Sequence, residues 1–342
     1  PDAKIKDALP PTKEERFKKG PPSFRELPAE QNVVDFVEFR NKEMAESMLA
    51  MCEAIKKTAS NKLVLAFYGY HMELSFSTGL QESGHLAQME VMDSPYVDIL
   101  CSPVSYMDRY AGGPGAFMAP VDSAPLHGKM RLLEDDLRTH LAPPDSMESK
   151  INGNRASADA HETYGVLSRN MGLDIAHSTA LWWMDLWGEG WYKGDEMWDF
   201  LAKLRKAHID ARDIPSPEPE VAVFLDERSQ FYMRAFPEHQ KTHLYKFRTD
   251  IFKIGATTGF YLLDDLISGK AKPAKLNLLL GAYAFDSKRL AALRAVTDKS
   301  SSTFVWFWAP GYVKDGTESD KNISECCGIT VAPSAQKDLG RV

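Results

Sequence analysis

The chain has 342 residues, of which 44% are hydrophobic and 26% are charged, and its formal net charge is −7. This length allows two domains at roughly 100–200 residues each, and the composition is that of ordinary globular proteins. The acidic balance argues against nucleic acid as the main partner, because such binding requires a basic face. No apolar stretch reaches the ~20 residues that a membrane span needs. A neutral substrate suits this charge.

The cysteines and histidines give no sign of a metal site. None of the cysteines has zinc-finger or C-x-x-C spacing, and we expect free thiols in a reducing compartment such as the cytoplasm. They are Cys52, Cys101, Cys326 and Cys327. The close pairs His71/Glu73 and His161/Glu162 lack the spacing of zinc enzymes. We therefore expect neither a metal nor a cofactor.

The first half of the chain alternates helical patterns with short apolar runs. In order, these are a helix over 33–57, an apolar run over 63–68, a helical segment over 84–93, apolar runs over 97–101 and 129–133, a helix over 158–171, an apolar run over 174–178, and a helix over 196–211. Such alternation is typical of βα units that form a parallel sheet.

Three prolines between 215 and 219 mark a linker, because proline continues neither helix nor sheet. We therefore divide the chain into domains at 1–214 and 220–342. The second domain repeats the α/β pattern and resembles a flavodoxin-like layer sandwich. Its expected strands lie at 221–225, 259–263, 275–280 and 303–308, and its expected helices at 241–254 and 287–297.

Polar and aromatic residues follow each expected strand of the first domain, where parallel sheets and barrels place their active sites. They are Tyr70, His71 and Glu73 after the first strand, Ser102, Tyr106 and Arg109 after the second, Glu134, Asp135, Asp136 and Arg138 after the third, and Trp182, Trp183, Asp185, Trp187 and Glu189 after the fourth. Carboxylates with arginines and flat rings suit the cleavage of a glycosidic bond. That reaction uses two carboxylates, ~5–5.5 Å apart in retaining enzymes.

Structural roles would explain the same residues. Glu134 and its two Asp neighbours could cap the next helix. Five of the seven tryptophans fall between Trp182 and Trp198, and clustered aromatic residues usually belong to a core. On spacing alone, neither reading is excluded.

Several stretches resemble glycoside hydrolases of the β-galactosidase family 42 type. In the first domain these are residues 102–106, 126–129, 133–139, 183–187 and 190–192, and in the second 260–266 and 305–312. The resemblance covers most of residues 30–331 in patches. It implies the C-terminal half of a (β/α)8 TIM barrel, followed by an amidotransferase-like α/β domain without amidotransferase activity. It also implies a carbohydrate substrate and a homo-oligomer, a trimer joined partly through the second domain.

The resemblance assigns roles residue by residue. Glu134 would be the nucleophile at the end of the seventh barrel strand, and Tyr106 would hydrogen-bond its carboxylate. The remaining assignments are Trp183 or Trp187 as a platform under the sugar, with Arg109 and Asp185 at the pocket rim.

The chain departs from this family in one important respect. A barrel of this kind has eight βα units, whereas we count four, which match strands five to eight. The family's acid/base Glu follows an Asn after the fourth strand, and the sequence contains no Asn-Glu pair. We therefore expect a fragment whose first half is supplied by a complementing chain or by further sequence, although Glu73 could act as the acid. The alternative is a non-catalytic half-barrel that binds carbohydrate or serves in assembly.

Overall fold

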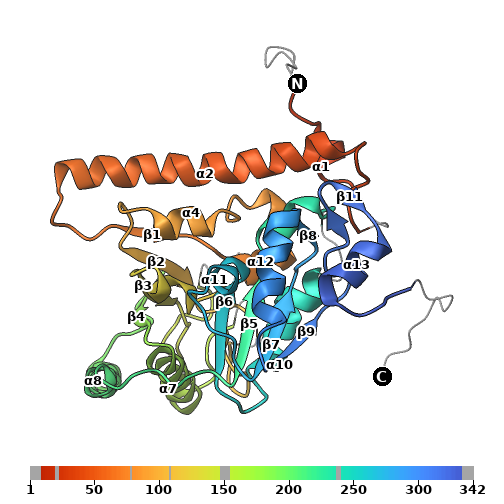
Figure 1. Ribbon diagram of the computed structural model, residues 1–342. Helices are drawn as coiled ribbons and strands as arrows, with labels where there is room; N and C mark the ends of the chain where they lie inside the picture. The colour runs from red at the N-terminus through yellow and green to blue at the C-terminus, as the bar shows by residue number, and fades with distance from the viewer. Residues whose placement is uncertain are drawn as a thin grey trace.

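A computed structural model describes residues 9–19, 23–77, 79–107, 109–146, 155–235 and 240–332 (Figure 1). Its two larger sheets are parallel and four-stranded, with strand orders β1-β2-β3-β4 and β6-β5-β7-β9. The α/β class expected from the sequence is therefore confirmed. No helix in the described ranges is long and apolar enough to cross a membrane.

The first sheet is built in chain order, with helices between its strands. The elements of this half are α1 (Lys13–Arg16), α2 (Gln31–Thr58), β1 (Leu65–Phe67), α3 (His71–Ser77), η2 (Leu80–Glu82), α4 (Gln88–Asp93), β2 (Ile99–Pro103), α5 (Ser123–Leu126), β3 (Met130–Asp135), α7 (Ala160–Ala176), β4 (Ala180–Trp183) and α8 (Asp195–Ala211). The long α2 runs above β1 and α4 in Figure 1.

The fourth strand was predicted in the wrong place. Residues 174–176 continue α7, and β4 begins only at Ala180. The short apolar run fits a helix as well as a strand, and such runs cannot be separated by periodicity alone. The helix stops soon after Asp174, where the hydroxyl of Thr179 donates to the Asp174 carboxylate at 2.5 Å and the Thr179 amide donates to the Asp174 carbonyl at 3.0 Å.

The second half forms the other sheet. Its elements are β5 (Val221–Leu225), η3 (Arg228–Tyr232), η4 (Lys241–Lys246), α10 (Phe247–Ile251), β6 (Thr258–Leu262), α11 (Leu263–Ser268), β7 (Leu276–Leu280), β8 (Ala284–Phe285), α12 (Ser287–Thr297), β9 (Thr303–Trp306), β10 (Val313–Lys314), β11 (Thr317–Glu318) and α13 (Asp320–Cys327). The expected helix over 241–254 divides into a π-helical turn, η4, and the short α10. Strands β8, β10 and β11 make a small extra sheet that the sequence did not predict.

The first sheet has two unlike faces, because side chains alternate along a strand. On the helix face, Ala66 and Leu100 pack in a core with Cys52 of α2 and Val91 of α4. Leu133 of the same face joins a second core, which extends into the second half.

The opposite face is partly uncovered, although Ile99, Cys101 and Glu134 on it are buried. Four large apolar side chains on it are 37–43% exposed: Leu65 37%, Phe67 43%, Met130 42% and Trp182 40%. We call these four residues and Glu134 the open face.

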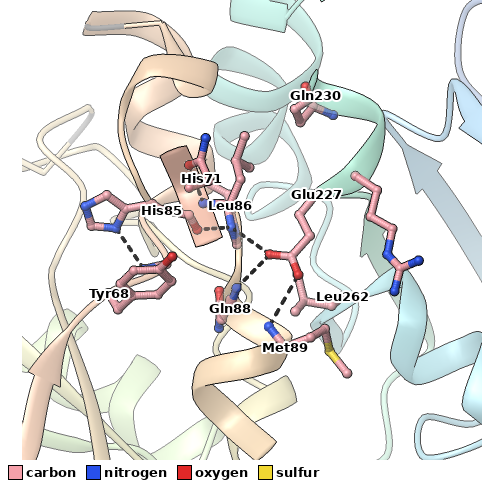
Figure 2. Close-up of polar contacts among 12 residues, drawn as sticks. Tyr68, His71, His85, Leu86, Gln88, Met89, Glu227, Gln230 and Leu262 are labelled. Atoms are coloured by element: carbon pink, nitrogen blue, oxygen red, sulfur yellow. Dashed lines mark hydrogen bonds and ion pairs between the residues drawn. The ribbon is translucent and has the colours of Figure 1, made fainter. Parts of the chain in front are cut away.

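The two halves pack against each other through more than the shared core. Phe24, near the start of the chain, forms an isolated bridge with Met233 and stacks on Trp308 with ring centroids 4.8 Å apart. In Figure 2, Glu227, which lies two residues beyond β5, reaches the first turn of α4. Its carboxylate accepts from the amides of Gln88 at 2.9 Å and Met89 at 3.3 Å. These contacts fix α4, and with it the loop after β1, against the second half.

Candidate active site

Glu134 lies on β3, one residue before its end. It pairs in register with Pro103 of β2 and Trp182 of β4. Its main-chain carbonyl accepts from the amide of Val104 at 2.9 Å. The residue is 7% exposed and belongs to the open face with Trp182. In such folds, reactive groups lie at the carboxyl edge of the parallel sheet, and the Glu134 carboxylate lies at this edge.

Burial controls the charge of Glu134. It raises the pKa of this carboxyl from 4.5 to about 7, and nearby Asp136 adds to the rise while Arg109 opposes it. The charged form is disfavoured because a buried carboxylate loses the solvation that water provides. Near neutral pH this group therefore exists in both forms, a property found in groups that exchange protons during catalysis.

Arg109 joins the loop after β2 to the end of β3. Its fully buried guanidinium forms an ion pair with Asp136 and donates to the carbonyl of Val104 at 3.1 Å. The same group lies over the ring of Tyr106, 4.8 Å from the centroid. Arg109 thus stabilises the charged form of Asp136 directly. The sequence, by contrast, suggested that an Arg or Tyr beside Glu134 would keep the Glu134 carboxylate ionised. Tyr106 is 41% exposed, and its predicted hydrogen bond to Glu134 stays a prediction.

Glu73 lies on α3 in a buried ion pair. Its carboxylate accepts from Arg248 of α10 at 2.5 Å and from the hydroxyl of Ser105 at 2.9 Å. Arg248 also donates to the carbonyl of Phe117 at 3.1 Å. This arrangement is typical of a structural ion pair between packed elements. It gives Glu73 a role in holding the β1 and β2 loops to the second half and makes it a poor candidate for a free proton donor.

The residues after β4 separate into two groups. Trp182 shares the open face with Glu134, whereas Trp183 points to the helix face and packs in a core with Leu137 and Trp191. This placement favours Trp182 over the predicted Trp183 as a flat surface beside Glu134. The sequence alone does not favour Trp182 over Trp183, because the face on which a strand residue lies depends on the register of the strand.

Two further predicted residues lie in the loop beyond β4. Trp187 is 44% exposed there, and its proposed contact with a sugar stays a prediction. Asp185 organises the loop itself, since its carboxylate accepts from the amides of Glu189 at 2.9 Å, Gly190 at 2.6 Å and Trp191 at 3.0 Å. A carboxylate that holds three main-chain amides has less capacity to bind a substrate hydroxyl.

A second polar cluster lies where the two halves meet (Figure 2). His71 Nε2 is 2.8 Å from the carbonyl of His85 and 3.4 Å from the Glu227 carboxylate. The ring of His85 accepts from the amide of Gly69 at 2.9 Å, and burial lowers its pKa to about 4, so it is neutral at ordinary pH. These contacts hold the turn after β1 against the second half.

Sequence reasoning missed three residues that shape the site: Arg248, Arg169 and Asn170. Arg248 comes from the second half, and Arg169 and Asn170 lie within α7. None of them follows a strand of the first sheet, so the strand-end rule did not select them. An arginine or asparagine inside an amphipathic helix carries no local signal of its tertiary partner.

The described residues contain no metal-binding cluster, and comparison with known proteins identifies no relative. Across the described residues, no group of three or more His, Cys, Asp and Glu side chains is arranged to hold a metal ion. The four cysteines are free thiols, and three of them are buried. No protein-family model matches the sequence, and no curated protein is significantly similar to it.

Proposed function

We propose that this chain carries half of a glycosidase centre, in which Glu134 is the nucleophile of a retaining β-glycoside hydrolase. The substrate class is a β-galactoside or a related β-glycoside, and the acid/base comes from a partner segment. The observation that supports this most is the position of Glu134, at the carboxyl edge of a parallel sheet and on the same face as the half-exposed Trp182. A flat ring beside a carboxylate suits a sugar next to an attacking group.

The proposal includes the C-terminal half of a (β/α)8 barrel followed by a flavodoxin-like domain. Two observations support the first part. In the described residues, β1 and β4 each pair along one edge only, and the open face is apolar where a barrel would have its interior. The second sheet has the strand order 2-1-3-4, which fits the start of a flavodoxin-like sheet.

The partner we propose for this half is a segment with the remaining four βα units. It would pair with β1 and β4, cover the open face and bring the second carboxylate opposite Glu134. An eight-stranded barrel closes both edges at once and fills its interior with side chains. Such a partner also explains why this chain contributes one candidate carboxylate and not two.

The raised pKa of Glu134 gives the proposal a consequence. A nucleophile must be ionised, so hydrolysis should increase as pH rises through about 7. A proton donor would give the opposite profile. The pH profile of kcat/KM therefore decides which of the two roles this residue has.

The decisive experiment measures hydrolysis of nitrophenyl β-galactoside by the full chain, alone and with the complementing segment. We expect Glu134→Gln to reduce kcat on the order of 10³-fold. The matched control is Glu189→Gln, another carboxylate beyond a strand end, which should retain most of the activity. Unchanged hydrolysis in Glu134→Gln would contradict the assignment. Sugar binding without hydrolysis, under all these conditions, would favour the carbohydrate-binding half-barrel instead.

A further inference from the structure

The loop after β2 carries Arg109, whose charge acts on the carboxyl of Glu134. Tyr106 and Arg109 belong to this loop, which returns to the sheet where the amide of Ser105 donates to the carbonyl of Ala116 at 2.8 Å. Between these points the described residues form no helix or strand. Besides the contacts of the Arg109 guanidinium with Asp136 and Val104, contacts from other elements therefore decide where the loop lies.

Arg169 of α7 supplies those contacts. Its guanidinium donates to three main-chain carbonyls of the loop: Arg109 at 2.7 Å, Tyr110 at 3.0 Å and Gly113 at 2.9 Å. Gly115 closes the loop against the same group, because a Cβ there would lie 2.8 Å from Arg169 Nε. A planar guanidinium with five N–H donors can hold several carbonyls in a fixed geometry, which a lysine ammonium does not reproduce.

The neighbouring residue connects this loop to the strand of Glu134. The side-chain oxygen of Asn170 accepts from Arg169 at 2.8 Å, and its amide donates to the carboxylate of Asp135 at 3.0 Å. Asp135 is the last residue of β3 and is fully buried. Arg169 and Asn170 thus form one hydrogen-bonded connection from the loop to the strand end.

We propose that Arg169 is a positioning residue, which with Asn170 fixes the loop of Tyr106 and Arg109 against the end of β3 and so sets where Arg109 lies relative to Glu134. The inference rests on the proposed role of Glu134 and adds the residue that adjusts it. Among the described residues Arg169 forms no ion pair with a carboxylate, and three of its hydrogen bonds hold the loop. We therefore expect Arg169 to act on the site through the position of the loop that it holds.

The charge of Glu134 is a suitable readout of this geometry. The titratable groups that face it are Asp136 beyond its own strand, Arg109 from the loop, Tyr70 after β1 and Cys101 on β2. Arg109 lowers the pKa of Glu134, whereas Asp136 raises it. If the loop is released, Arg109 moves and Asp136 remains, so the pKa of Glu134 should rise.

The test is a titration of the Glu134 carboxyl carbon by ¹³C NMR in the full chain, with the resonance assigned from Glu134→Gln. We expect Arg169→Met to raise the pKa by about 0.5–1 unit and Arg169→Lys to raise it by less. The control is Arg155→Met. Arg155 also lies beside this loop, over the Tyr110 ring at 4.4 Å, but it bonds none of the three carbonyls. We expect no shift in that variant.

Two outcomes would overturn the inference. One is a wild-type titration of Glu134 in a folded Arg169→Met protein, with folding checked by near-ultraviolet circular dichroism. The other is an equal shift in Arg155→Met. If Arg169→Met does not fold, Arg169→Lys decides, and an unchanged pKa there has the same meaning. This readout does not depend on turnover, so loss of the proposed function by the hydrolysis test would be a separate result.

Discussion

Glu134 is a single residue whose burial has consequences for both chemistry and stability. Among the described residues its side chain has no ion pair of its own, and Arg109 is paired with Asp136. The carboxyl is therefore easier to protonate in the folded protein than in the unfolded chain. Ionisation of Glu134 therefore lowers the free energy of unfolding whether or not a substrate is present.

The pH dependence of stability follows from that shift. The pKa of Glu134 is raised from 4.5 to about 7. Its contribution is therefore fully present below pH 4.5 and is lost as pH rises through 7. We expect Glu134→Gln to increase the free energy of unfolding on the order of 2 kcal/mol at pH 8, with a much smaller change at pH 5.

Urea unfolding at both pH values measures this effect. Asp213→Asn, at an exposed position just before the linker, serves as the control and should show no pH-dependent difference from wild type. An equal effect of Glu134→Gln at pH 5 and pH 8 would mean that the carboxyl titrates normally in the folded protein.

At the scale of elements, the short helix α4 depends on a carboxylate from the other half of the chain. Its N-cap residue, Ala87, provides no side-chain cap. Glu227 fills that role by accepting from the first helical amides (Figure 2). A negative charge there also interacts favourably with the helix dipole. One side chain therefore stabilises a helix end and an interface between the halves.

Removal of this cap should destabilise both the first turn of α4 and the interface between the two halves. We expect Glu227→Ala to lower the free energy of unfolding by about 1–2 kcal/mol and to accelerate hydrogen exchange at the amides of Gln88 and Met89. Exchange measured by mass spectrometry or NMR tests this directly. Glu43→Ala, at an exposed position on α2, should change neither quantity. Unchanged protection of the two amides would show that α4 does not need Glu227.

At the scale of the whole molecule, the open face leaves large apolar side chains exposed. Its four large side chains project from a sheet that pairs along one edge at β1 and at β4 within the described ranges. Exposed apolar surface next to an open strand edge favours association with other chains. The complementing segment that we propose, and the trimer that the family resemblance implies, are two forms of such association, and both remain predictions.

The chain without its complement should therefore self-associate. We expect Phe67→Lys to shift the protein towards the monomer at micromolar concentrations, because a charge on an edge strand disfavours pairing. Sedimentation velocity over a range of concentrations measures the shift. Ile254→Lys replaces a side chain that is 52% exposed outside the open face and should have little effect. Equal monomer fractions in wild type and Phe67→Lys would exclude the open face as the contact surface.

The sequence by itself predicted the α/β class, most strand positions and the location of Glu134 at a strand end. These features depend on local patterns of apolar residues, which are present in the sequence independently of its tertiary contacts. The fourth strand was misplaced because a short apolar run has no distinct period. The role of Glu73 was also not predictable, since its partner Arg248 lies 175 residues away.

Tertiary structure decided what surrounds Glu134. Strand register placed Trp182, and not Trp183, on its face, and the packing of α7 brought Arg169 and Asn170 to the loop beside it. Burial then set the charge of the carboxyl, through a desolvation that no local pattern encodes. The sequence placed the candidate nucleophile Glu134 at a strand end, whereas long-range packing determined which groups surround it and in which charge state it lies.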